Sequence, residues 1–236
     1  MEVSIKCPDC GKTLKVTITT EETKKTEIIK QISKETTWFE IAEQIKSGKA
    51  KEYLSVKDRI PFVLKNGQEV CAVVAAINHY NKNEVLFTFE NCIAKHRMNK
   101  NDTNEGGWKD SEMKKYLNND IYNLLPDDLK QFITERKIVQ RIKDREYVSV
   151  DKIWLPSITE LGNERNIDVG DIPFPLFEDE KSRIRQIDGE TISYWTRSPN
   201  ATNSNTFYGV SHAGVNNASS GASNTYGVCP CFSIGA

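Results

Sequence analysis

The chain has 236 residues, of which 38% are hydrophobic and 28% are charged. A chain of this length and composition can bury one sizeable core, which excludes a wholly disordered protein and allows one domain with a small appendage. Its 32 basic and 33 acidic residues leave a formal net charge of -1, so no net field attracts polyanions and we expect neither nucleic acid nor an anionic membrane as a partner.

The sequence contains no signal for membrane insertion. No apolar run approaches the ~20 residues that a membrane helix needs. The start, MEVSIKCPDCGK, lacks the continuous apolar core of a secretory signal. We therefore expect synthesis in the cytosol, although a component of a phage particle would have the same features. The few close pairs among the cysteines do not indicate a disulfide framework.

The N-terminal segment carries half of a zinc-ribbon pattern. Cys7 and Cys10 lie in CPDCGK, where two thiolates on a tight turn would take two of zinc's four positions. No Cys or His follows before Cys71, so the pair fits a knuckle without metal, zinc completed by distant ligands or a second chain, or a redox pair. Zinc at this pair is the only cofactor that the sequence suggests. We assign residues 1–33 to a Cys-containing segment with a linker and residues 34–236 to the main domain.

A capping box predicts the first helix. Thr37 and Glu40 have the spacing at which each side chain satisfies a first-turn backbone donor of the other. Gly48 is a suitable stop, which gives a helix of about ten residues that packs into the core. Apolar residues follow the capping box at helical spacing: Trp38, Ile41, Ala42 and Ile45.

Three strands are expected next. Residues 60–65 and 69–77 flank Asn66 and Gly67, which form the strongest short-range hairpin signal. Residues 84–89 supply a third strand after a polar turn. We expect these strands to form an antiparallel meander.

The middle of the chain predicts two helices. Pro126 opens the second, with Asp127 and Asp128 in its first turn, where the helix dipole explains two acidic residues better than catalysis does. The first follows Gly106 and presents one apolar stripe: Met113, Tyr116, Leu117, Ile121 and Leu124.

Two further strands and a short helix are expected before the C-terminal region. Residues 137–142 and 148–155 have the composition of strands. Ser157 and Glu160 form a second capping box, which predicts a short helix ended by Gly162.

The C-terminal stretch differs from the rest in charge. From residue 198 to the end there is no Asp, Glu, Lys or Arg. Residues 206–210 and 226–234 have the pattern of short strands, with Asn, Ser, Gly and Ala as turns between them. We infer a folded scaffold with a neutral, hydrogen-bonding surface, because disordered tails seldom carry regularly spaced apolar anchors. The anchors are Trp195, Phe207, Val210, Val215, Tyr226, Val228, Phe232 and Ile234.

Several stretches of the chain serve as landmarks. They are, in order, GGWKDSEMKKYLN at 106–118, LPDDLKQFI at 125–133, WLPSITELG at 154–162, YWTRSP at 194–199 and TYGVCPCFSI at 225–234. These landmarks resemble a bacterial and phage domain of unknown function that is similar to the C-type lectin fold. That group includes formylglycine-generating-enzyme-like domains and the variable proteins of diversity-generating retroelements. The likeness covers about residues 36–236 and implies an α+β, C-type-lectin-like fold, with small antiparallel sheets, flanking helices and a loop-rich C-terminal binding region.

The ending departs from the family pattern, which usually has Gly-Val-Arg-Pro-Ala. Cys229 takes the place of the Arg and Cys231 that of the Ala. On one strand these cysteines would point to the same side about 6.5–7 Å apart, which does not suit a mutual disulfide. We interpret them as buried thiols, with metal or redox roles left open.

Resemblance to retroelement variable proteins accounts for the neutral C-terminal composition. Those systems rewrite adenines near the 3′ end of the gene and leave a surface enriched in Asn, Ser, Thr, Tyr, His, Gly and Ala. We take residues 198–236 as the candidate variable region, whose composition is that of a paratope; a low-complexity region selected for solubility is the alternative. The candidate ligand-binding residues are Asn200, Thr202, Asn203, Ser204, Asn205, Tyr208, Ser211, His212, Asn216, Asn217, Ser219, Ser220, Ser223, Asn224 and Tyr226.

The function that we expect is recognition of a protein or glycan ligand, as in receptor binding, without enzymatic activity. One alternative is a formylglycine-generating-type oxidoreductase, for which Cys229 and Cys231 have no His, Lys or Arg near them in sequence to lower a thiol pKa. Another is a structural component of a phage particle without a diversified site. His79 and His96 lack a partner at an informative spacing, and we interpret both as structural or solvated. The sequence leaves the oligomeric state open.

Overall fold

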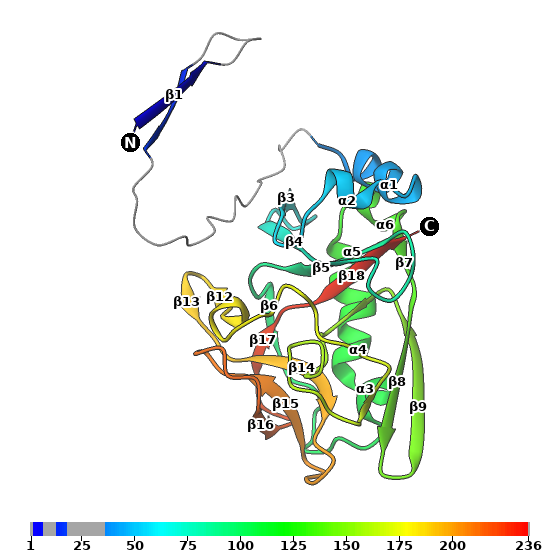
Figure 1. Cartoon of the computed structure of the whole chain (residues 1–236). Helices are drawn as coiled ribbons and strands as arrows, with labels where there is room; N and C mark the ends of the chain where they lie inside the picture. Colours follow the sequence, from blue (N-terminus) through cyan, green and yellow to red (C-terminus); the bar gives the residue numbers. More distant parts are fainter. Residues whose placement is uncertain (1, 7–12, 18–35, 236) are drawn as a thin grey trace.

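The computed structural model describes residues 2–6, 13–17 and 36–235. In this part of the chain, short helices accompany several small sheets, whose strands are antiparallel except for one parallel pair (Figure 1). The expected α+β class with small antiparallel sheets and flanking helices is therefore confirmed. No helix in these ranges is long and apolar enough to cross a membrane.

The N-terminal residues that are described form a two-stranded antiparallel sheet. Strand β1 (Glu2–Lys6) pairs with β2 (Thr13–Thr17). Cys7 and Cys10 fall between them in the sequence and lie outside the described residues, so zinc at this pair stays a prediction.

The first helix of the main domain, α1 (Trp38–Lys46), begins at the predicted capping box. The Thr37 hydroxyl accepts from the Glu40 amide at 3.2 Å, and the Glu40 carboxylate accepts from the Thr37 amide at 2.9 Å. Gly48 follows the helix with a φ of 78°, in the left-handed region that favours glycine. Both ends of this helix are thus confirmed.

The predicted meander is the middle of a larger sheet. Its strands run in the order β10-β18-β5-β4-β3, and β7 pairs with the same edge of β18 as β10 does. The C-terminal strand therefore lies between the meander and two short strands from the middle of the chain. The bounds are β3 (Arg59–Val63), β4 (Glu69–Ile77), β5 (Glu84–Phe89), β7 (Ile133–Thr134), β10 (Ile153–Trp154) and β18 (Cys231–Gly235).

Aromatic rings join this sheet to α1. Trp38 meets Phe87 and Phe232 edge-on, with ring centroids 5.8 and 5.9 Å apart, and the two phenylalanines stack at 5.1 Å. All three side chains are buried. Because such aromatic contacts add to the gain from burial, the first helix and the last strand are held in one core.

The predicted helix after Gly106 is broken into short pieces. Its expected stripe is largely right: Met113, Leu117 and Ile121 are buried, whereas Tyr116 and Leu124 are half-buried. The break falls at Ser111, whose hydroxyl accepts from the Lys114 amide and caps a new helix. The pieces are α3 (Gly107–Asp110), α4 (Glu112–Tyr116), a π-helical turn (Leu117–Ile121) and α5 (Tyr122–Leu124). The second predicted helix is α6 (Asp127–Lys130), which follows Pro126 and has Asp127 and Asp128 in its first turn.

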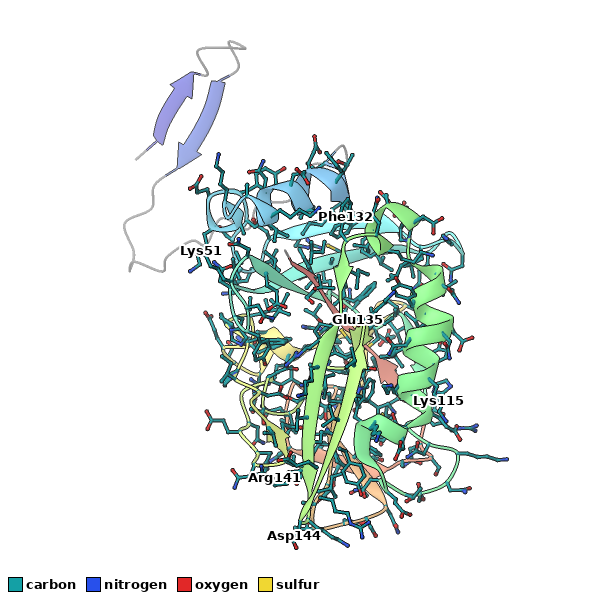
Figure 2. The ribbon with its side chains drawn as sticks, turned by 90° about the vertical axis from the view of Figure 1, so that its right-hand side faces the viewer. Lys51, Lys115, Phe132, Glu135, Arg141 and Asp144 are labelled. Carbon is teal, nitrogen blue, oxygen red and sulfur yellow. The ribbon has the colours of Figure 1, made fainter. Side chains whose placement is uncertain are left out.

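A long ribbon extends along these helices. Strand β8 (Arg136–Ile142) pairs with β9 (Arg145–Asp151), and β11 (Asp168–Val169) joins the other edge of β8. Figure 2 shows the ribbon running down to Arg141 and Asp144 beside the helical segment that bears Lys115.

The second capping box forms without the predicted helix. The Ser157 hydroxyl accepts from the Glu160 amide at 3.0 Å, and the Glu160 carboxylate accepts from the Ser157 amide at 2.8 Å. The segment nevertheless makes only turns, and Gly162 ends them with a φ of 88°. The prediction of a helix was wrong because Gly162, in the left-handed region, comes only five residues after Ser157 and leaves room for a single turn.

The C-terminal region builds a second sheet, in the order β16-β15-β14-β17-β6. The expected strand over 226–234 is in fact two strands in two different sheets, separated at Cys229 and Pro230. Before this sheet, a 3-10 turn (Lys181–Arg183) leads to the hairpin β12 (Gln186–Ile187) and β13 (Glu190–Thr191). The sheet's bounds are β6 (Ala94–His96), β14 (Tyr194–Pro199), β15 (Thr206–Val210), β16 (Ala218–Gly221) and β17 (Tyr226–Val228).

Candidate functional site

The frame of the C-terminal sheet is buried. Trp195, Phe207, Val210 and Val228 are each at most 1% exposed. Of the fifteen candidate binding residues, Asn200 alone is buried and the others are half-buried or exposed. Apolar residues thus hold the sheet in place while most polar neighbours remain accessible.

The candidate residues do not form one surface. Tyr208 pairs with Ser219 across β15 and β16, and Phe207 pairs with Ser220. Since paired residues share a face and successive residues alternate, Ser220 lies on the face opposite Tyr208. The Ser220 hydroxyl donates to the Tyr226 hydroxyl oxygen at 3.0 Å, which places Tyr226 opposite Tyr208 as well. The candidate residues therefore do not share a single surface, which corrects that expectation.

On one face, Tyr208 is enclosed by other groups. The Arg165 guanidinium lies 5.2 Å from the centre of its ring, and its hydroxyl donates to Asn200 Oδ1 at 3.4 Å. Asn200 Oδ1 also accepts from the amide and hydroxyl of Thr202, at 3.0 and 2.8 Å. Asn200 is buried and organises this turn, and its place among the ligand-binding residues stays a prediction. A cavity of about 680 Å³ lies beside this face, lined in part by Arg165 and Ala201.

On the other face, a row of side chains from three parts of the chain surrounds Tyr226. The Tyr226 ring packs on Trp195 with centroids 4.8 Å apart, and Tyr226 pairs with His96 on β6. The His96 ring stacks on Tyr116 of α4 at 4.1 Å with an interplanar angle of 6°. We call Tyr116, His96, Ser220, Asn224 and Tyr226 the Tyr226 face.

Sequence reasoning missed the contribution of His96 and Tyr116 to this face. They lie about a hundred residues before Tyr226, and only the pairing of β6 with β17 brings them there. Asn224 Nδ2 completes the row by donating to Ser220 Oγ at 2.8 Å. The face therefore combines aromatic rings with amide and hydroxyl groups.

Two earlier side chains anchor the C-terminal turns and were also missed. Asn104 Nδ2 donates to the backbone oxygens of Asn200, Asn203 and Thr206 at 2.9, 3.0 and 2.8 Å. Asp102 Oδ1 accepts from the amide and hydroxyl of Ser223 at 2.8 and 2.7 Å. No spacing signal links these residues to the C-terminal turns. Asn104 thus fixes the turn at residues 200–206. The exposed polar residues of this turn are Thr202, Asn203, Ser204 and Asn205.

The turn between β15 and β16 forms a third group. It packs on residues 161–183, because Asn216 Nδ2 donates to the Leu161 oxygen at 2.7 Å and Arg183 Nε donates to the Gly214 oxygen at 2.9 Å. His212 and Asn217 are exposed there, and Ser211 is half-buried.

A buried ion-pair network lies beneath the sheet. Arg197 of β14 is fully buried and its Nη1 donates to Glu160 at 2.6 Å, while Nη2 pairs with Asp171. Arg136 bridges the same two carboxylates at 2.5 and 2.8 Å. Burial raises the pKa of Glu160, but the charges of Arg136 and Arg197 outweigh it and lower the pKa to about 2. The network fastens the turns at 157–171 to the sheet.

Asp168 should give the protein a measurable pH dependence. Burial raises its pKa to about 6, although the Ser198 and Thr159 hydroxyls donate to it at 2.8 and 3.1 Å. The unfolded chain releases this proton near pH 4 and the folded chain near pH 6, so the free energy of unfolding falls as pH rises between these values. Burial also raises the pKa of Asp171, which adds to the fall in the same direction. In Asp168→Asn the fall should therefore shrink by on the order of 3 kcal/mol in urea unfolding curves measured between pH 4 and 7.

The matched control for this measurement is Asp144→Asn at the exposed tip of the β8–β9 ribbon. It should leave the pH profile as in the parent protein. A profile that Asp168→Asn does not alter would contradict the assignment.

The two C-terminal cysteines are buried, as expected. Cys229 is 1% and Cys231 0% exposed, and burial raises the pKa of Cys231.

In the part of the chain that the structure describes, no group of three or more His, Cys, Asp or Glu side chains is arranged to hold a metal ion.

The fold and this surface define an α+β protein of small antiparallel sheets whose C-terminal residues, 198–235, display uncharged polar groups. Residues 82–236 match the family described as a domain of unknown function, DUF6273, and the chain belongs to this family. Comparison with curated proteins and with solved structures gives no match.

Proposed function

We propose that this protein is a recognition protein that binds a protein or glycan ligand through its C-terminal sheet, on a scaffold of the C-type-lectin-like kind. The observation that carries the proposal is the separation of roles in this sheet. Buried Trp195, Phe207, Val210 and Val228 hold it, and uncharged polar side chains remain accessible around them. Polar groups on loops and edges of a rigid framework are typical of binding surfaces.

Within this sheet, we assign the central contact to the Tyr226 face. Its rings offer contact area at a low cost in side-chain entropy. Packing on Trp195 restricts the Tyr226 ring, and stacking on Tyr116 restricts the His96 ring. Ser220 and Asn224 add hydrogen-bonding groups beside the rings. Tyr208 is a weaker candidate, because its neighbour is the charged guanidinium of Arg165 and, among the described residues, no second aromatic ring within contact adds to its area.

Binding measurements on two single variants test this assignment. Ligands are first selected with an array of glycans and a displayed library of random peptides. Tyr226→Ala should then lower the affinity for the selected ligand at least tenfold, because it removes an anchoring ring. A tenfold loss corresponds to about 1.4 kcal/mol of binding free energy. Tyr208→Ala on the opposite face should change the affinity less than twofold. Thermal unfolding of both variants shows whether the fold is kept.

If Tyr208→Ala lowers the affinity tenfold and Tyr226→Ala does not, the binding site lies on the face that carries Tyr208. Unchanged binding in both variants, or no ligand above background on either array or library, would contradict the proposed function.

The proposed relation to diversity-generating retroelements has its own test in the DNA. We expect a neighbouring reverse-transcriptase gene and a near-copy of the codons for residues 198–236 that differs at adenines. The differences should fall on exposed positions such as Asn203 and Asn217 and spare the buried Phe207 and Val210. A near-copy that changes the buried positions equally would contradict this origin.

A further inference from the structure

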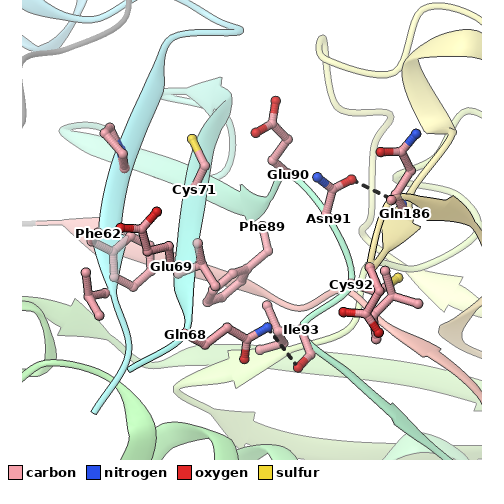
Figure 3. Close-up of a pocket in the computed structure, with 16 residues that line it drawn as sticks. Phe62, Gln68, Glu69, Cys71, Phe89, Glu90, Asn91, Cys92, Ile93 and Gln186 are labelled. Carbon is pink, nitrogen blue, oxygen red and sulfur yellow. Dashed lines mark hydrogen bonds between the residues drawn. The ribbon is translucent and has the colours of Figure 1, made fainter. Parts of the chain in front are cut away.

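A cavity of about 540 Å³ lies between the β3–β4 hairpin, residues 89–93 and the β12–β13 hairpin (Figure 3). Small-molecule sites in proteins commonly have volumes of about 300–1,000 Å³. The described residues that line this cavity include neither a candidate binding residue nor any member of the Tyr226 face. The cavity is therefore separate from the recognition surface proposed above.

Hydrogen bonds between the three segments hold the walls of the cavity together. The Gln186 amide donates to Asn91 Oδ1 at 3.1 Å, and the Cys92 amide donates to the Gln186 oxygen at 2.9 Å. Beside the β3–β4 turn, Gln68 Nε2 donates to the Ile93 oxygen at 3.5 Å. The bonds to Asn91 and Ile93 are the dashed lines in Figure 3. A cavity with fixed walls loses little conformational entropy when a ligand enters.

Part of the cavity lining is apolar. The rings of Phe62 and Phe89 meet with centroids 5.7 Å apart, and Phe62 packs edge-on against Trp38 of the core. Phe62, Val70 and Ile187 line the cavity and are only half-buried. This apolar area stays partly open to solvent in the protein alone, so covering it with the apolar part of a ligand is favourable.

The charge around the cavity is negative. Three carboxylates line it, from Glu69 of β4, Glu90 and Asp188 of the β12–β13 turn, and among the described residues no Lys, Arg or His does. Arg59 pairs with Glu90. Glu69 and Asp188 are exposed, and neither forms an ion pair with a described residue. The field of these two carboxylates attracts cations and repels anions.

We propose that this cavity binds a small organic cation, an arylalkylamine whose ammonium group lies in the field of Glu69 and Asp188 and whose ring covers Phe62 and Val70. The apolar lining requires an apolar body, which a metal ion lacks. The carboxylates require a positive charge, which a neutral or anionic aromatic molecule lacks. A protonated amine with one aromatic ring meets both requirements.

An NMR titration of the full-length protein with 2-phenylethylamine tests the proposal. The amine of this probe, like that of lysine, is protonated at pH 7. We expect saturable shifts at backbone amides of both hairpins, such as Val70, Cys71 and Ile187, with a dissociation constant of about 1 mM or lower for a ligand of this size. The amides of Ser220 and Tyr226 should not shift. Absence of saturable shifts at the lining amides would overturn the proposal.

Three analogues separate the contributions of the charge and the ring. 2-Phenylethanol has a hydroxyl in place of the ammonium group and should bind at least fivefold more weakly. 3-Phenylpropionate carries a negative charge and should give no saturable shifts. Ethylamine keeps the ammonium group without the ring and should bind at least tenfold more weakly. Equal affinities for 2-phenylethylamine and 2-phenylethanol would overturn the proposal, because the charge would then contribute nothing.

Paired substitutions show whether the two carboxylates supply the attraction. Glu69→Gln with Asp188→Asn should lower the affinity for 2-phenylethylamine at least fivefold and leave the affinity for 2-phenylethanol within twofold of the parent value. The matched control is Glu190→Gln with Asp144→Asn, which removes the same charge at exposed positions that do not line the cavity. The control should change the affinity for the amine less than twofold. Equal losses in the two paired variants would assign the effect to net charge and overturn the proposal.

Discussion

Replacing Glu160 by alanine should lower the free energy of unfolding by about 3–5 kcal/mol. The substitution removes one of the two carboxylates that the fully buried Arg197 and Arg136 share and leaves Asp171 alone against two buried positive charges. It also removes the acceptor for the Ser157 amide. The cost arises mainly from stranding buried positive charge, and urea unfolding followed by tryptophan fluorescence measures it.

The chain supplies a matched control at the same distance. Arg141 Nη2 and Glu146 Oε1 are also 2.6 Å apart, but both side chains are about half exposed. Solvent screens this pair, so Glu146→Ala should cost less than ~1 kcal/mol. Equal losses in Glu146→Ala and Glu160→Ala would show that the buried network contributes no more than a surface ion pair.

Gly214→Ala is expected to cost about 2–5 kcal/mol, because backbone strain and overlap add. Gly214 has a φ of 86°, and a Cβ there would lie 1.9 Å from the backbone oxygen of Glu180. A backbone atom cannot move aside as the end of a flexible side chain does. The turn that carries His212 and Asn217 would therefore separate from the 3-10 turn at Lys181–Arg183, and thermal or urea unfolding would detect the loss.

Gly170→Ala separates the two causes. Gly170 has a similar φ of 80° but no atom within 4 Å of its Cβ position. Its substitution should cost about 1–2 kcal/mol from backbone strain alone. If Gly214→Ala costs no more than Gly170→Ala, the contact with Glu180 does not hold the turn.

Local rules succeeded where the deciding contacts are close in sequence. The box at Thr37 and Glu40 begins α1 because its donors and acceptors are three residues apart. Asn66 and Gly67 join the meander strands as expected, and Thr206–Val210 forms a strand with the predicted bounds. In each case neighbouring residues supply most of the relevant interactions.

The same rules were less successful where distant groups take part. The box at Ser157 and Glu160 has the right hydrogen bonds but no helix, since Gly162 ends the turn. Two arginines from distant strands pair with its carboxylate and hold this turn on the sheet. The run over 226–234 has the composition of one strand, yet it crosses between two sheets at Cys229 and Pro230. In both cases the partners that position the segment lie in other parts of the chain and cannot be read from the segment's own residues.

The candidate site illustrates both outcomes. Composition identified accessible polar residues between buried anchors, and fourteen of the fifteen candidates are indeed at least partly exposed. The arrangement was not available from composition, because alternation along β15 and β16 sends Tyr208 and Tyr226 to opposite faces. The C-terminal region also contacts side chains that come about a hundred residues earlier in the sequence. They are His96, Asp102 and Asn104, and Tyr116 stacks on His96.

By itself, the sequence determined the mixed class of the fold, the first helix, the meander and the neutral character of the C-terminal sheet. These depend on the spacing of apolar residues and on hydrogen bonds between near neighbours. Only the tertiary structure decided which polar residues share a face and which carboxylates pair with Arg197. Pairing partners and buried charges are chosen among all segments of the chain, so their selection requires the packed molecule.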